Sequence, residues 1–182
     1  MKNLSKKLIF LICTLALFCA FSLSGCGESD ETPAGDAPGF GKSDLYLVIG
    51  GTKYYCDRDI NDIISTFGED YEYSEAISCA YDGLDKTYGY GDFEVLTYPD
   101  GDKDYVQEIY VFGGSAQTSK GIKLGDSKDD VTELYGEGND TGYLLTYELP
   151  ASNEKSEGAS LYFTFDGDRV SAMAITAEQP IE

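Results

Sequence analysis

Two similar stretches of the sequence predict most of the architecture. Residues 56–70 read CDRDINDIISTFGED, and residues 124–138 read LGDSKDDVTELYGEG, at an offset of 68 residues. Each copy predicts a short helix, because Asp59 and Ser127 are good N-cap residues and apolar side chains then recur at helical spacing. A glycine follows each predicted helix, where a left-handed residue is favoured. We therefore expect one structural unit to be used twice.

An antiparallel meander is predicted after each helix. The paired segments are 75–81 with 143–149, FEVLTY (93–98) with SLYFTF (160–165), and VQEIYVF (106–112) with VSAMAIT (170–176). Acidic Asp-Gly turns join the last two strands of each meander and favour hairpins. Another hairpin is expected before the first helix, in LYLVIGGTKYYC (45–56).

These units predict an α+β fold. Two units are too few for an open solenoid, so they are expected to share one core. Repeat one would span about 44–112 and repeat two about 113–176. We expect the two tandem helix-plus-meander repeats to share one antiparallel sheet, with two helices on one face.

The second copy carries a longer motif. Residues 121–136 read GIKLGDSKDDVTELYG and fit the pattern G-I-x-x-G-x-S-x-x-x-V-x-x-x-Y-G. In a chain with tandem units and an export signal, this pattern resembles the β-lactamase-inhibitor-protein-like family, which includes small lipoproteins of the outer-membrane β-barrel assembly machinery. The resemblance implies protein binding through a polar, aromatic-rich sheet face and does not point to catalysis.

The N-terminus predicts export and a lipid anchor. Lysines precede an apolar run from Leu8 to Leu23, which is shorter than the ~18–20 residues of a permanent membrane span. The sequence Leu23-Ser24-Gly25-Cys26 then resembles a bacterial lipobox. We expect residues 1–25 to be a signal peptide and Cys26 to carry acyl chains such as palmitate, on the extracytoplasmic face of the cell membrane. The alternative is an ordinary signal peptide with a chance cysteine.

A tether is predicted between the anchor and the folded part. Residues 27–43 are rich in Gly, Pro, Ser and acids and nearly devoid of aliphatic side chains, so they bury too little surface to fold. We expect residues 26–43 to be a lipidated flexible tether and residues 44–182 to be a single domain.

Composition excludes several functions. The chain has 13 Lys+Arg, 33 Asp+Glu and no histidine, for a net charge of −20. The charge repels phosphate backbones, so nucleic acid is not an expected partner. The absence of histidine excludes histidine-dependent triads and histidine-ligated zinc. Asp100, Asp102 and Asp104 alternate as in a calcium loop, but Tyr105 and Val111 replace the glycine and glutamate that such a loop requires, so we expect a hairpin turn.

Two cysteines would remain in the exported domain. Cys56 and Cys79 form an even pair in an extracytoplasmic setting, which favours a disulfide. The alternative is two free thiols, because cysteine also behaves as a small buried hydrophobe.

The 15 tyrosines are the remaining unusual feature. Helical phase predicts a core position for Tyr135, and strand alternation predicts core positions for Tyr98, Tyr110 and Tyr162. Four others lie in or near connections rich in glycine and acids and are the expected binding surface: Tyr71, Tyr73, Tyr88 and Tyr90. The alternative is that they are half-buried strand residues.

The predicted function is a membrane-anchored, non-catalytic module that binds another envelope or secreted protein, with a basic partner favoured by charge. The alternative is a lipoprotein that binds a small ligand, a sugar or peptidoglycan fragment, over tyrosine rings. We expect no catalytic residues, no metal and no cofactor, because no flanking sequence singles out a reactive pair.

Overall fold

The computed structural model describes residues 39–180, all of which belong to one compact unit. The predicted signal peptide, the lipidation site Cys26 and tether residues 26–38 lie outside the described residues. The last tether residues, 39–43, are packed on the domain. Phe40 contacts the rings of Tyr135 and Tyr147, with centroids 6.4 and 5.9 Å away. The folded part therefore begins before residue 44, with Phe40 packed on the domain. The sequence did not indicate this, because glycine, proline and acids dominate the composition of the segment.

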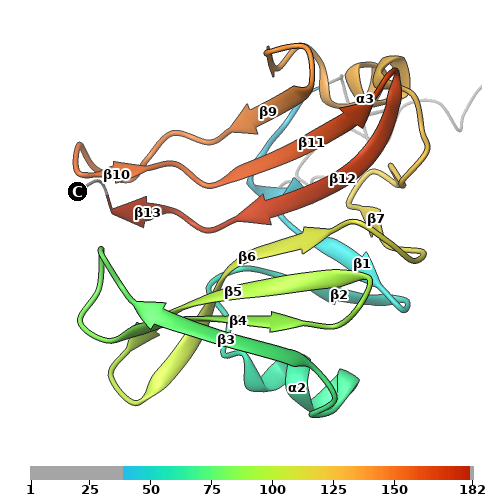
Figure 1. Cartoon of the computed structure of the whole chain (residues 1–182). Helices are drawn as coiled ribbons and strands as arrows, with labels where there is room; N and C mark the ends of the chain where they lie inside the picture. The colour runs from blue at the N-terminus through green and yellow to red at the C-terminus, as the bar shows by residue number, and fades with distance from the viewer. Residues whose placement is uncertain (1–38, 181–182) are drawn as a thin grey trace, which may run out of the picture. The chain divides into compact units, whose positions relative to one another are not determined.

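Most strands of the described part lie in one eight-stranded antiparallel sheet (Figure 1). In spatial order its strands are β3 (Glu72–Ile77), β4 (Leu84–Gly89), β5 (Phe93–Asp100), β6 (Lys103–Val111), β12 (Arg169–Thr176), β11 (Ser160–Asp166), β9 (Leu144–Glu148) and β8 (Asn139–Asp140). The hairpins β5–β6 and β11–β12 meet at the centre, where β6 pairs with β12.

Two smaller sheets and the helices complete the fold. The strands of the small sheets are β2 (Thr52–Tyr54), β1 (Leu47–Ile49) and β7 (Gln117–Thr118), and β10 (Ser156–Glu157) with β13 (Gln179–Pro180). The helices are the 3-10 helix η1 (Lys42–Asp44), α2 (Asn61–Phe67) and α3 (Lys128–Tyr135). The α+β class is therefore confirmed. The expectation of a single sheet is not, because the short edge segments pair among themselves.

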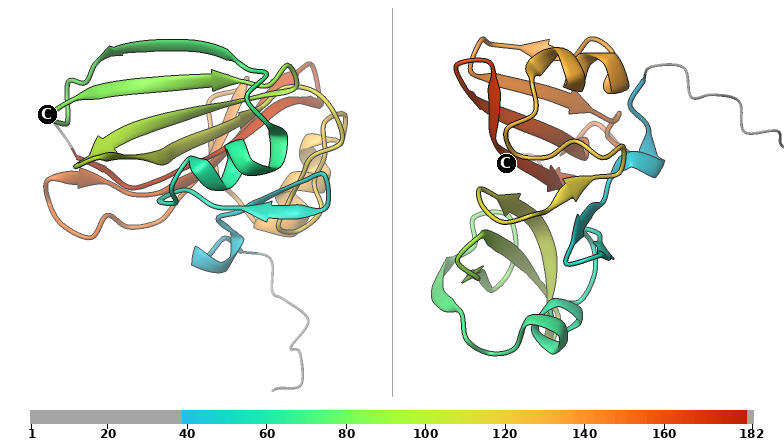
Figure 2. Two further views of the ribbon diagram at one scale, coloured as in Figure 1. Left: turned by 90° about the horizontal axis from the view of Figure 1, so that it is seen from below. Right: turned by 90° about the vertical axis from the view of Figure 1, so that its right-hand side faces the viewer.

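Both α-helices lie on the same face of the large sheet (Figure 2). The ring of Phe67, in α2, lies 5.0 Å from that of Phe93, and the ring of Tyr135, in α3, lies 6.0 Å from that of Phe163. Phe93 and Phe163 belong to one cross-strand row, through Val111 and Met173. Because the side chains of one row share a face, both helices cover the same core.

The two α-helices end alike but begin differently. Gly68 and Gly136 follow them with φ of 84° and 79°, as expected, and donate to carbonyls four residues earlier. Ser127 caps α3 in a reciprocal box, in which the Asp130 amide donates to its hydroxyl at 3.1 Å. Asp59 forms no such box, because it accepts from the amide and side chain of Asn61, and α2 begins one residue later than predicted.

The first meander contains a strand that the sequence pattern missed. The predicted segment 75–81 starts as β3 at Glu72, and β4 (Leu84–Gly89) was expected to be a connection. All six β3 residues are exposed, and β4 buries only Tyr88. An edge strand without a buried face has no alternating apolar pattern, so periodicity did not identify this pair.

Candidate binding surface

One face of the eight-stranded sheet is not covered by the α-helices, and we call it the open face. A continuous cross-strand row runs across it. In strand order the row is Glu72, Gly89, Glu94, Tyr110, Ala174, Tyr162, Thr146 and Asn139. It alternates with the core-facing row of Phe93, because successive residues of a strand point to opposite faces.

Two tyrosines dominate the centre of the open face. Tyr110 and Tyr162 flank Ala174, and their rings lie 6.4 Å apart. The Tyr162 hydroxyl donates to Glu108 Oε1 at 2.6 Å. Burial raises the pKa of the Glu108 carboxyl, and burial together with this hydrogen bond raises the pKa of Tyr162. The hydrogen bond holds the Tyr162 ring beside Glu108 on the open face.

A second aromatic group lies around the β5–β6 hairpin. Tyr98 stacks between Tyr81 and Tyr105, with ring centroids 4.7 and 5.9 Å apart. The Tyr98 hydroxyl donates to Asp57 Oδ1 at 3.1 Å, and burial raises its pKa. Asp57 has a φ of 57°, and aspartate is one of the few residues besides glycine that adopts this conformation.

The expected core tyrosines divide between two environments. Tyr135 is buried in the core, as predicted. Tyr98, Tyr110 and Tyr162 are only half-buried, and Tyr110 and Tyr162 lie on the open face, so their predicted core positions are wrong. Their neighbours Ile109, Leu161 and Phe163 fill the core instead, so alternation identified the strands but the aromatic residues were assigned to the wrong face.

The four tyrosines expected to form the binding surface do meet, but they largely extend the core. The ring of Tyr71 lies 5.0 Å from Tyr88, 5.6 Å from Tyr90 and 6.5 Å from Tyr73. Tyr88 is buried, and Tyr90 stacks on Phe93 with centroids 5.0 Å apart. Burial raises the pKa of Tyr90 to about 12. Tyr73 is 50% exposed and donates to Glu75.

Two of these tyrosines also line a cavity. A groove of about 570 Å³ lies where β3 begins and β4 ends. It is bounded by Asp70, Tyr71, Glu72, Gly89, Tyr90, Gly91, Glu94 and Phe112. Sequence reasoning identified Tyr71 and Tyr90 but not Phe112 or the carboxylates, because strand pairing brings them together.

Cys56 and Cys79 are free thiols in the structure, and the expected bridge is not formed in it. Cys56 is half-buried, lines a pocket of about 330 Å³ and donates to the Ile175 carbonyl at 3.4 Å. Burial raises the pKa of its thiol well above the ordinary value, which disfavours the reactive thiolate. Cys79 is exposed between β3 and β4.

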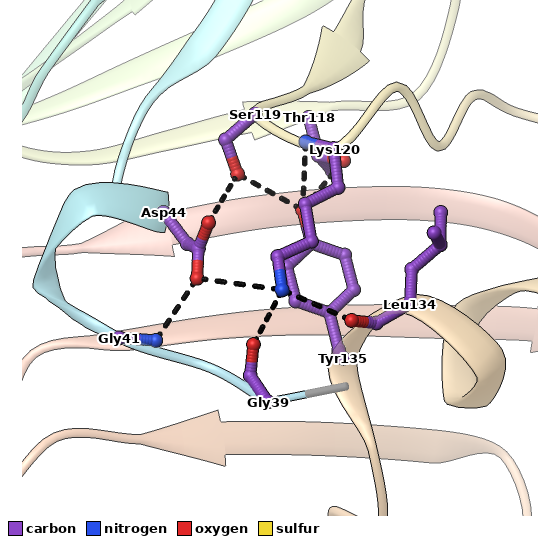
Figure 3. A network of polar contacts seen from close by, with 8 residues as sticks. All are labelled: Gly39, Gly41, Asp44, Thr118, Ser119, Lys120, Leu134 and Tyr135. Carbon is purple, nitrogen blue, oxygen red and sulfur yellow. Dashed lines mark hydrogen bonds and ion pairs between the residues drawn. The ribbon is translucent and has the colours of Figure 1, made fainter. Parts of the chain in front are cut away.

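The most connected polar cluster surrounds the Tyr135 hydroxyl (Figure 3). This hydroxyl donates to Thr118 Oγ1 at 2.8 Å, accepts from the Lys120 amide at 3.2 Å and lies 3.1 Å from Ser119 Oγ. Ser119 in turn donates to Asp44 Oδ1 at 3.2 Å. Burial raises the pKa of Tyr135, so the phenol stays protonated and holds β7 against α3.

Lys120 completes this cluster and holds the N-terminal segment (Figure 3). Its Nζ donates to the carbonyls of Leu134, at 3.0 Å, and Gly39, and lies 3.9 Å from Asp44 Oδ2. The ammonium therefore stabilises the C-terminus of α3 and fixes the start of the domain beside it.

Among residues 39–180, no three His, Cys, Asp or Glu side chains are grouped to hold a metal ion. Asp100 and Lys103 pair at the β5–β6 turn, as the hairpin prediction required, and Asp104 forms an ion pair with Lys86 at 2.7 Å. The described helices are too short or too polar to span a bilayer.

Comparison of the chain with protein-family models, with curated proteins and with solved structures finds no match.

Proposed function

We propose that the chain is a membrane-anchored, extracytoplasmic lipoprotein that acts as a non-catalytic protein-binding module through the open face of its large sheet. One observation carries the proposal: an eight-stranded sheet buries one face under two helices, while the other presents Tyr110, Tyr162 and Glu94 in a single row. Rigid tyrosines supply contact area with little loss of conformational entropy on binding.

Charge favours a basic protein partner. The chain carries a net charge of −20, and Glu94 and Glu108 lie beside the central tyrosines of the open face. Such a surface attracts basic partners, and the attraction weakens as salt screens it. A second envelope protein or a secreted protein fits this requirement.

The fold of the proposed module is two copies of one unit, and recurring hydrogen bonds support this. The Asp57 amide donates to the Val106 carbonyl at 2.8 Å, and the Gly125 amide donates to the Val170 carbonyl at 2.8 Å. The bridge Asp59–Tyr105 likewise has a counterpart in Ser127–Arg169. Together with the motif at 121–136, these contacts favour kinship with the β-lactamase-inhibitor-protein-like family.

The proposed anchor rests on the sequence of residues 1–26. An apolar run followed by Leu23-Ser24-Gly25-Cys26 is the pattern at which lipoprotein precursors are acylated and cleaved. Mass spectrometry of the protein isolated from membranes tests this directly. We expect an N-terminal peptide that begins at an acylated Cys26, and an unacylated Cys26 would contradict the anchor.

The contacts of Lys120 and the raised pKa values of two tyrosines support a non-catalytic role. Lys120 is fixed by two carbonyls and an acid, and the pKa values of Tyr135 and Tyr162 lie above the ordinary value of tyrosine. A proton-transfer group works best with a pKa near the working pH, and these shifts move in the opposite direction.

Affinity capture tests the binding function. The full chain would be used to capture proteins from an envelope extract of its host at low and at high ionic strength. We expect a partner that is retained at low salt and lost from the double variant Tyr110→Ala/Tyr162→Ala. The matched control is Tyr143→Ala, which removes a 69% exposed tyrosine outside the central row. Equal capture by all three proteins would contradict the proposal.

One observation favours a second candidate, a small-ligand receptor. The stack of Tyr81, Tyr98 and Tyr105 beside Asp57 offers ring surface and a hydrogen-bonding group, which suit a sugar or peptidoglycan fragment. A specific ligand would raise the melting temperature by mass action. A thermal-shift screen with such fragments separates the candidates, because the protein-binding module predicts no saturable shift.

A further inference from the structure

The groove beside β3 and β4 forms where Gly89, which has no side chain, interrupts the open-face row. Glu72, Gly89 and Glu94 are directly paired neighbours on three adjacent strands. A Cβ built on Gly89 would lie 3.5 Å from the Glu72 Cβ and 3.9 Å from the Glu94 Cγ. The missing side chain therefore leaves a gap between two carboxyl-bearing side chains.

An aromatic ring lies beside this gap. Phe112 lines the groove and is 41% exposed, with its ring 5.8 Å from that of Tyr110 on the open face. The groove is thus continuous with the tyrosines of the open face. The rings of Tyr71 and Tyr90 lie on the helix-covered face instead, because Tyr90 stacks on Phe93 and its hydroxyl donates to the Gly68 carbonyl at 3.3 Å.

The carboxylates of the groove have no positive partner within the domain. Asp70, Glu72 and Glu94 line it, and none of its lining residues is basic. In the described part of the chain, the ion pairs join other acids: Asp44, Asp59, Asp104 and Asp140. Three acids beside the exposed Phe112 ring create a negative potential that a cation would neutralise.

We propose that this groove binds an arginine side chain of the protein partner. The inference rests on the proposed protein-binding function and names the chemistry of its anchor residue. A guanidinium group is planar, stacks on aromatic rings and forms paired hydrogen bonds with carboxylates, whereas an ammonium is a compact and strongly hydrated charge. Phe112 supplies the ring, and Glu72 and Glu94 supply the carboxylates on both sides of the gap.

Peptide titration of the full chain in detergent micelles tests the groove. The probe is the capped tripeptide acetyl-Gly-Arg-Gly-amide, and the matched probe carries citrulline, which keeps the shape of arginine without its charge. We expect the arginine peptide to shift the backbone amide signals of Gly89 and Gly91 saturably, with a Kd on the order of 1 mM, since one side chain supplies little affinity. The citrulline peptide should leave both signals unchanged.

Two variants locate the site. Gly89→Val fills the groove, and the strand tolerates valine because Gly89 does not adopt a left-handed φ. Glu94→Gln removes one carboxylate without changing shape and keeps the test valid if valine disturbs folding. We expect each to weaken arginine-peptide binding at least tenfold, and the control Glu133→Gln, on α3, to bind as the unchanged chain does.

Two results would overturn this inference. One is binding of the citrulline peptide as tightly as the arginine peptide. The other is unchanged binding by both Gly89→Val and Glu94→Gln. Failure of the arginine anchor can be distinguished from failure of the protein-binding function. If the groove variants still capture the partner that Tyr110→Ala/Tyr162→Ala loses, the arginine anchor is refuted and the open face is not.

Discussion

The two halves of the domain, residues 44–112 and 113–176, make the same turn into their helices with different residues. The second half uses Gly125, with a φ of 88°, and the capping residue Ser127. The first half has Asp57 and Asp59 at the matching positions, and Asp57 adopts a φ of 57°. In the second half, glycine at a positive φ and serine at the N-cap are the residues that these positions favour. The first half departs from this preference and thereby places a carboxylate on Tyr98.

The turn residues of the first half are therefore not the ones that local folding preference favours. Local rules are usually broken where a site needs a particular side chain. The first half also carries the groove and the tyrosine stack, whereas the second half carries the buried network of Tyr135. The central pair of the open face draws on both halves, because Tyr110 belongs to the first half and Tyr162 to the second.

The largest effect is expected from the helix residues that face the shared core. Ile63 and Val131 occupy matching positions and are 3% and 0% exposed. Ile63→Ala should lower the free energy of unfolding by about 2–5 kcal/mol, and Val131→Ala by less, because fewer methyl groups are removed. Urea unfolding measures both. Each variant should shift a single transition, and two separate transitions would show that the halves unfold independently.

The next effect distinguishes two buried hydroxyl groups. Tyr135→Phe removes the hydroxyl that joins Thr118 and Lys120, so it should lower the free energy of unfolding by about 1–3 kcal/mol. In the first half, the buried Tyr54 hydroxyl has no hydrogen-bond partner among the described residues. Tyr54→Phe is the matched control and should be neutral or stabilising. Equal losses in urea unfolding would contradict the contrast between the halves.

A smaller effect is expected where the chain turns into each helix. Gly125→Ala places a Cβ at a φ of 88° and should destabilise the domain by about 1 kcal/mol. Asp57→Gly relieves the same strain but loses the contact with Tyr98, so its change in unfolding free energy should be smaller in size. Thermal unfolding compares them. A larger loss for Asp57→Gly would show that its carboxylate stabilises the fold.

The smallest effect is a dependence on pH. The Ser127 hydroxyl and amide lower the pKa of Asp130 below its ordinary value of 3.8, and the Asn61 amide and Lys103 lower that of Asp59. A lowered pKa means that the unfolded chain takes up the proton more readily. The stabilisation is therefore complete above about pH 4 and is lost as pH falls through the folded pKa. NMR titration of both carboxyls checks the direction, and a pKa above 3.8 for either would contradict it.

The sequence predicted the parts of the fold that depend on local chemistry. The two helices, the Gly50–Gly51 hairpin and the central strands could be located because caps, glycines and apolar alternation lie within short windows. The edge pair β3–β4 could not, since it has almost no buried face. The single predicted sheet is in fact three sheets, because the short strands β1, β2 and β7 pair among themselves and β10 pairs with β13.

The candidate site was predicted less completely than the fold. Tyr71 and Tyr90 were identified from their surroundings in sequence, but Glu72, Gly89 and Glu94 become neighbours only through strand register. The central tyrosines were misassigned because a half-buried open face and a core face both show alternation, and tyrosine suits either. Register and the face covered by helices are long-range properties that local patterns do not determine.

Site-specific photo-crosslinking tests whether the open face is the surface that contacts the partner. A photoreactive phenylalanine analogue would replace Tyr110, at the centre of the open face, or Glu133, on the exposed side of α3, in the full chain expressed in its host. We predict that the analogue at position 110 crosslinks one protein partner and that the analogue at position 133 does not. Crosslinking of the partner from position 133 alone would contradict the assignment of the open face as the binding surface.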